Sequence, residues 1–221
     1  MENLFVTFPS WSISDGNYSP FQKGQKVNFA LNIENAKIRK SLKKQCYLKQ
    51  RIFAEYSFCA KVIGNYSQEG MDGHFLVLET GLYKFFMHSY GKRFSYQEGE
   101  FIVGKGELAV DYFIWREQSY KIQDVPDIYY DFVIEKILYI NFPIKCTTVN
   151  DEVIIIYTSR SSPESEYEIV EIENMSDRVG ESIELEEQLN DNNIATYYSR
   201  SFTLFILKRV GLYPDPFLNN N

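Results

Sequence analysis

Apolar and polar residues alternate over much of this chain, with the two-residue period of a strand that buries one face. The pattern is clean in residues 26–33 and longest in residues 46–62. The apolar positions of the longer segment share one parity; they are Cys46, Leu48, Ile52, Ala54, Tyr56, Phe58, Ala60 and Val62. A strand of that length would extend for roughly 55 Å, which exceeds typical strands, so we expect a bend or bulge within it.

Glycines interrupt two further apolar segments. Gly81 divides residues 74–88, which predict either two strands or one strand with a bulge. Residues 101–115 alternate again, with Gly104 and Gly106 within the inward-facing parity. Glycines at such positions indicate strong curvature or the close approach of another backbone.

The C-terminal half continues the strand pattern. Residues 132–144 and 153–157 flank a turn-like Asn150-Asp151, and we expect them to pair as a hairpin. Pro143 has no backbone N–H to donate, so the first of these strands should lie at a sheet edge there or end near it. Residues 197–207 predict a last, aromatic-rich strand.

Helical spacing is rare. Residues 182–190 predict one short helix, with Leu185 and Leu189 four positions apart, and residues 36–44 predict a second, weaker one. Seven or more strands with little helix predict a mainly β fold, either an antiparallel β-sandwich or a partly open β-barrel with one or two short helices. We expect residues 1–221 to form a single β-rich domain, with a subdivision near 117–127 as the alternative.

The composition supports this prediction and adds one question. The chain contains 17 Phe, 17 Tyr and 2 Trp, and aromatic side chains suit the pleated surface of a sheet. Many of these rings fall on the inward parity of the predicted strands. Tyr47, Phe53, Phe113 and Trp115 fall on the opposite parity, which leaves them for binding or for a second packed layer.

The net charge of −7 hides two opposed segments. Residues 36–61 contain eight basic residues and one acidic residue, a net of +7. Residues 162–191 contain eleven acidic residues and one arginine, a net of −10. A surface patch of one sign steers the association of partners of opposite sign.

The acidic segment, residues 162–191, has three interpretations. It is a docking surface for a basic protein, a solvated face that keeps the protein soluble, or a cover for the basic segment of the same chain. As a docking surface, its candidate protein-binding residues are Glu181, Glu184, Glu186, Glu187 and Asp191.

The basic segment favours a different partner, nucleic acid. Its candidate nucleic-acid-binding residues combine phosphate-binding cations with an aromatic ring that could stack on a base; they are Lys49, Arg51, Phe53 and Lys61. The acidic net charge opposes this interpretation, and lysines on an edge strand also prevent aggregation between sheets without any ligand.

Catalytic, metal and cofactor signatures are missing from the sequence. His74 and His88 are the two histidines, and neither has a nucleophile and an acid at a usable spacing. Three cysteines without a CxxC pair predict neither a disulfide framework nor a zinc site, which is typical of a reducing compartment. We therefore expect no enzyme activity, no cofactor and no metal.

These observations predict a soluble cytoplasmic protein that binds another macromolecule. The sequence contains no apolar segment of membrane-spanning length, and its start has neither a basic region nor an apolar run of signal-peptide length. The first hypothesis is a protein–protein interaction through the acidic surface, for example that of an immunity-type inhibitor with a basic target. The alternatives are a single-stranded nucleic-acid-binding, OB-like barrel that uses the 46–62 strand, and a β-barrel that encloses a small ligand.

Overall fold

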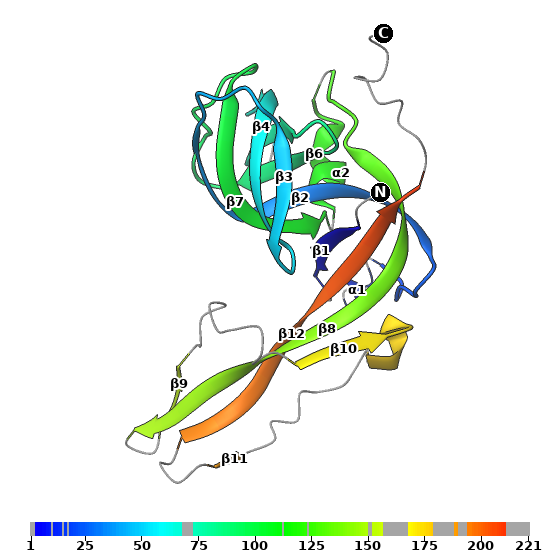
Figure 1. Cartoon of the computed structure of the whole chain (residues 1–221), viewed down its shortest axis with the longest axis vertical. Coiled ribbons are helices and arrows are strands. Elements are labelled where there is room, and N and C mark those ends of the chain that lie inside the picture. Colours follow the sequence, from blue (N-terminus) through cyan, green and yellow to red (C-terminus); the bar gives the residue numbers. More distant parts are fainter. Residues whose placement is uncertain are drawn as a thin grey trace.

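The computed structural model shows a mainly β protein (Figure 1). It describes residues 3–9, 11–14, 16, 18–67, 73–111, 113–122, 124–149, 152–156, 168–178, 188–189 and 194–210. The strands are β1 (Leu4–Phe8), β2 (Lys26–Lys40), β3 (Tyr47–Ile52), β4 (Glu55–Tyr66), β5 (His74–Glu79), β6 (Lys84–Ser89), β7 (Phe101–Val110), β8 (Tyr129–Val149), β9 (Glu152–Ile156), β10 (Glu168–Ile172), β11 (Gln188–Leu189) and β12 (Ile194–Arg209). The helical segments are α1 (Trp11–Ser14), α2 (Ile114–Ser119) and the 3-10 turn η2 (Met175–Arg178). None of the helices in these ranges is long and apolar enough to cross a membrane.

The strands form one mixed sheet whose pairings close two five-stranded rings. The first ring runs β2-β6-β5-β4-β7, and the second runs β2-β8-β12-β1-β7. Strand directions cannot alternate all the way around a ring with an odd number of members, so each ring needs a parallel pair. These pairs are β2 with β6, at Asn32 and Phe86, and β1 with β7, at Thr7 and Ala109.

The two rings share β2 and β7, which are long enough to serve both. In β2, Lys26–Ala30 pair with β8, and Leu31–Lys40 pair with β7. In β7, Phe101–Glu107 pair with β4, and the single bridge to β1 follows them along the strand. Beyond the second ring, β8 and β12 continue together as a two-stranded arm, flanked in turn by β10, β9 and β11 (Figure 1).

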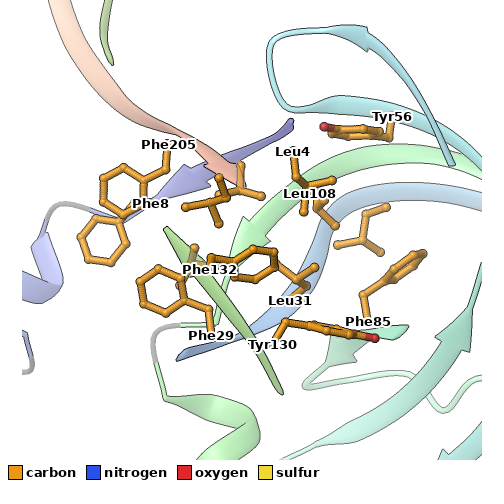
Figure 2. Close-up of a cluster of buried hydrophobic side chains, with 14 of the residues drawn as sticks. Leu4, Phe8, Phe29, Leu31, Tyr56, Phe85, Leu108, Tyr130, Phe132 and Phe205 are labelled. Atoms are coloured by element: carbon orange, nitrogen blue, oxygen red, sulfur yellow. The ribbon is translucent and has the colours of Figure 1, made fainter. Parts of the chain in front are cut away.

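One hydrophobic cluster fills the interior of both rings (Figure 2). In the second ring, the Phe8 and Phe205 rings stack with their centroids 4.9 Å apart, and Phe21 packs edge-on against Phe8 at 5.2 Å. In the first ring, Phe58 and Phe85 meet edge-on at 5.5 Å. Such pairs each contribute about 0.5–1.5 kcal/mol beyond the burial of their area. The aromatic content is therefore used largely in the core.

A second layer covers the outer face of β5 and β6. The Trp115 ring of α2 stacks on Phe86 at 5.3 Å between centroids and meets Phe75 edge-on at 5.9 Å. Ala30, Val77, Ile114 and Ile128 complete this buried cluster. Trp115, whose parity pointed away from the core, thus belongs to a second packed layer. The predicted strand over 101–115 ends at Val110 and gives way to α2.

The predicted segment 46–62 is a hairpin, not a single strand. β3 and β4 pair antiparallel, and the turn between them includes Phe53, which has a positive φ of 45°. Both arms keep the same apolar parity because they pack on the same core. The alternation therefore runs through the turn without a visible break, and only the length of the segment indicates it.

Both helix predictions need correction. Residues 36–44 do not form a helix, because β2 continues to Lys40 in register with β7; its cross-strand hydrogen bonds outweigh the weak four-residue spacing of Ile38 and Leu42. In the predicted helix 182–190, Gln188 and Leu189 form β11, which pairs with β12. The other residues of that segment lie outside the described ranges.

The remaining strand predictions are confirmed. Residues 74–88 form two strands, β5 and β6, and β8 pairs with β9 as a hairpin. Pro143 faces Tyr198 of β12, while on its other side β10 pairs up to Asn141 and β9 pairs from Lys145. The proline thus lies between two partner strands, where no backbone N–H is needed.

Candidate functional site

The outer face of β2, β7, β4 and β3 carries a group of basic residues that we call the basic face. Its members are Lys37, Arg39, Lys49, Arg51, Lys61 and Lys105. They alternate with side chains that point into the first ring, such as Ile102 on β7 and Phe58 on β4. Inward burial of the apolar parity therefore forces these cations onto one outer surface.

The strand register brings three of these lysines into one row. Lys37 on β2 lies directly opposite Lys105 on β7, Lys105 lies opposite Ser57 on β4, and Ser57 lies opposite Lys49 on β3. Directly opposite residues share a face and lie about 4.5–5.5 Å apart at Cβ, and like charges in that position are destabilising. The row thus holds positive charge that nothing in the strand pairing itself neutralises.

A neighbouring row supplies an aromatic ring. Arg39, Val103, Cys59 and Tyr47 lie opposite one another in turn across the same four strands. The Tyr47 side chain is 41% exposed. An exposed ring next to a row of cations is the combination used by proteins that bind single-stranded nucleic acids.

A row of carboxylates borders the basic face. Glu34, Glu107 and Glu55 form the next row across β2, β7 and β4. Glu55 lies 3.4 Å from the Arg51 Nε atom. Within the described part of the chain, the other five members of the basic face form no ion pair.

The structure separates the four residues that the sequence singled out for nucleic-acid binding. Lys49 and Arg51 lie on the outer side of β3, and Lys61 lies farther along β4, opposite Glu79 and Phe101. Phe53 at the hairpin turn packs against the buried cluster of Ala54, Ile140 and Leu204. The exposed aromatic ring on this face is therefore Tyr47, not Phe53.

Sequence reasoning missed Lys37 and Lys105 as site residues. Lys37 fell in the supposed helix 36–44, and Lys105 stood between two glycines whose role is conformational. Gly104 and Gly106 do allow a close backbone approach, since a Cβ on Gly106 would lie 2.8 Å from the Glu34 carbonyl oxygen. The register between β2 and β7 brings the two lysines together, and no local pattern encodes that register.

The acidic candidates Glu181, Glu184, Glu186, Glu187 and Asp191 lie outside the described residues. Two other carboxylates of the acidic segment can be placed. Glu171 lies 2.8 Å from Lys136 Nζ and 3.3 Å from Lys23 Nζ, and Glu173 lies 2.8 Å from Lys23 Nζ. The hydrogen bond from Lys136 and that from Lys23 lower the pKa of Glu171. Neither of these lysines belongs to the basic face.

Two arrangements bear on catalysis. Ser67 Oγ and His74 Nδ1 lie 2.7 Å apart, but no carboxylate among the described residues accepts a hydrogen bond from His74, as an acyl-transfer triad would require. Asp111 is buried below α2. Burial raises its pKa to about 6, although backbone hydrogen bonds from Trp115 and Phe113 act to lower the pKa. The described residues contain no group of three or more potential metal ligands.

The first ring has the strand pairing of an OB-fold barrel, but the order of its strands along the chain is circularly permuted. β4, β5 and β6 form an antiparallel meander, β6 runs parallel to β2, and β7 closes the ring between β2 and β4. In OB-fold barrels the second and third strands present the binding face. The corresponding strands here, β5 and β6, are covered by α2. The cations of the basic face lie on the other strands of this ring and on β3 and are exposed, whereas Cys59 among them is buried and its Sγ atom is hydrogen-bonded to Ser41 and Lys43.

Comparisons with protein-family models, with curated protein sequences and with solved structures find no match to this chain.

Proposed function

We propose that the protein is a non-catalytic binding protein whose basic face takes a single-stranded nucleic acid. The observation that carries this proposal is the cross-strand pair of Lys37 and Lys105, in one row with Lys49. Like charges placed directly opposite each other weaken a sheet, and a polyanion bound across them relieves the repulsion.

The geometry favours a single strand over a duplex. Four neighbouring strands spaced about 4.8 Å apart give a face roughly 15 Å wide, on which a backbone can run along the row of lysines. Tyr47 in the adjacent row offers an exposed ring on which an unpaired base can stack, and Arg39 stands at the other end of that row. Base stacking on such a ring requires no particular sequence, so we expect weak base preference.

The net charge of −7 restricts where such a ligand can bind. A phosphate backbone is repelled by most of the surface and attracted where cations outnumber carboxylates. Binding should therefore be local to the basic face and should weaken steeply as salt is added, because counterions are released from the nucleic acid.

A fluorescence anisotropy titration with labelled oligo(dT) and oligo(rU) at low salt tests the proposal. We expect the double variant Lys37→Gln with Lys105→Gln to weaken binding at least tenfold and to reduce the salt dependence. Lys26→Gln is the matched control, because Lys26 is an exposed lysine on the same strand but lies in the second ring. No binding of either oligonucleotide at low salt, or equal losses in the control, would rule the proposal out.

A second candidate function rests on the acidic segment, whose net charge of −10 over residues 162–191 favours a basic protein partner. An immunity-type inhibitor of a basic protein is one example of this class. Charge reversal of Glu184, Glu186 and Glu187 to Lys, followed by capture of partners under native conditions, tests it. An unchanged set of partners would exclude this segment as a binding surface. The third idea, a barrel that encloses a small ligand, has no support inside the rings, because the core cluster fills them.

A further inference from the structure

A pocket of about 360 Å³ lies where β2 separates from β6. These two strands are parallel and meet in a single bridge, between Asn32 and Phe86. Beyond that bridge the pocket is lined by residues 32–36 of β2, by residues 87–89 at the end of β6, by Phe94 and by Ile114 of α2. Ligand pockets in proteins typically measure about 300–1,000 Å³, so this one has room for a small molecule.

A bulge in β2 forms one wall of the pocket. The register between β2 and β7 shifts between Glu34 and Lys37, where Asn35 and Ala36 together oppose Gly106. Asn35 has a positive φ of 51°, and its Nδ2 donates a hydrogen bond to Glu107 at 3.1 Å. The wall is therefore fixed by backbone conformation and by a cross-strand hydrogen bond.

Asn32, one of the lining residues, carries a buried hydrogen-bond acceptor next to the pocket. The Asn32 side chain is 4% exposed, and its Nδ2 donates to Glu34 Oε1 at 3.1 Å. Its Oδ1 atom is buried and has no partner among the described residues. Leaving a buried acceptor unpaired is unfavourable, so a ligand that donates a hydrogen bond to it recovers free energy.

The charge and shape of the lining define the ligand class. Among the described residues that line the pocket, Glu34 is the one carboxylate, and none is a lysine or an arginine. Met87, Phe94 and Ile114 supply apolar surface. The His88 ring is held in place by stacking on Phe75 at 4.6 Å between centroids. The pocket thus combines a negative, oxygen-rich end with an apolar wall.

We propose that this pocket binds a small primary amine. Its ammonium group donates hydrogen bonds to Asn32 Oδ1 and to the Glu34 carboxylate, and its carbon chain lies against the apolar lining. The ammonium group matches the site because it carries three donors and the positive charge that Glu34 attracts. The pocket and the basic face use different side chains, so this proposal stands independently of nucleic-acid binding.

Hexylamine is a suitable probe, with hexanol and hexanoate as ligands of equal chain length. Ligand-observed NMR and calorimetry should show saturable binding of hexylamine, at least tenfold tighter than that of either comparator. Glu34→Gln should weaken hexylamine binding about tenfold. Asn32→Leu, which keeps the approximate shape but removes the unpaired acceptor, should abolish it while the free energy of unfolding stays equal or rises.

Two control variants distinguish a site from general attraction of amines to an acidic protein. Glu55→Gln removes a carboxylate from the same cross-strand row as Glu34 but outside the pocket, and should leave binding unchanged. Asn28→Leu changes an asparagine on the same side of β2, whose Nδ2 donates to Asp131 at 2.7 Å, and should also leave binding unchanged. Absence of saturable hexylamine binding, equal binding of hexanoate, or undiminished binding by Asn32→Leu would overturn the proposal.

Discussion

Asp111 Oδ2 accepts a hydrogen bond from the backbone N–H of Trp115 at 3.1 Å, and this contact fixes the start of α2 against the outer face of β5 and β6. The backbone N–H of Phe113 donates to the other carboxylate oxygen at 3.4 Å. One buried carboxylate therefore satisfies two backbone donors where β7 ends and α2 begins.

The stability of the protein should depend on the protonation of Asp111. Burial raises its pKa to about 6 in the folded state, from 3.8 in the unfolded chain, so the folded state binds this proton more tightly. The contribution of Asp111 to stability is thus present at low pH and is lost as the pH rises through about 6. Between pH 4.5 and 7.5 it should decrease by about 2 kcal/mol. Denaturant titrations of the wild type and of Asp111→Asn at both pH values measure it. A pH dependence that is the same in both proteins would contradict the assignment.

Removing one lysine of the central row should change stability and binding in opposite directions. Lys105→Gln relieves the repulsion with Lys37 and should raise the free energy of unfolding by about 0.2–1 kcal/mol at low salt. The same variant should weaken oligonucleotide binding several-fold. Thermal unfolding at low and high salt, with Lys26→Gln for comparison, measures the first effect. A loss of stability in Lys105→Gln would show that the row is not under electrostatic strain.

A side chain at position 106 should disrupt the bulge of β2. A Cβ there would lie 2.8 Å from the Glu34 carbonyl oxygen and 3.0 Å from the Ala36 Cβ, and backbone atoms cannot yield as a flexible side chain can. We expect Gly106→Ala to cost about 1–3 kcal/mol, which chemical denaturation would detect. Gly91→Ala is the matched control, because a Cβ there meets nothing within 4 Å and the effect should stay within about 0.5 kcal/mol.

Arg209 should stabilise the contact between the end of β12 and the β5–β6 turn. Its guanidinium carbon lies 4.5 Å from the centroid of the Tyr130 ring, and its Nη1 donates to the Leu82 carbonyl oxygen at 3.0 Å. Loss of the cation–π contact and of this hydrogen bond predicts that Arg209→Ala lowers the free energy of unfolding by about 1–2 kcal/mol. The neighbouring Lys208→Ala should change it by less than about 0.5 kcal/mol, because Lys208 forms one exposed ion pair, with Glu135 at 3.7 Å. Equal effects of the two substitutions would contradict this role of Arg209.

Local sequence patterns predict the strands of this protein better than their partners. The alternation in residues 26–33 identifies β2, because burial of Val27, Phe29 and Leu31 is a local consequence of the pleat. The same alternation hides the turn at Phe53, since both arms of the hairpin pack on one core. Closure into two rings depends on which strand meets which, and that is decided by packing over the whole chain.

The candidate sites likewise depend on strand pairings that local sequence patterns do not predict. Lys49 and Arg51 are visible as cations on a strand, but Lys105 joins them only through register. The unpaired acceptor on Asn32 has no sequence signal, because an asparagine within a strand is equally compatible with a solvated edge. The candidate sites therefore depend on the registers between distant strands and on the cavities between those strands. Local sequence patterns do not encode either of them.

The sharing of β2 and β7 by both rings has a consequence for synthesis on the ribosome. All strands of the first ring lie between Lys26 and Val110, so this ring can assemble once half of the chain has emerged. The second ring must wait for β12, whose Leu207 pairs with Leu4 near the other end of the sequence. Throughout that interval β1 has only its single bridge to β7. The nascent protein therefore exposes an apolar strand until its last strand arrives, and chaperone protection would matter most in that interval.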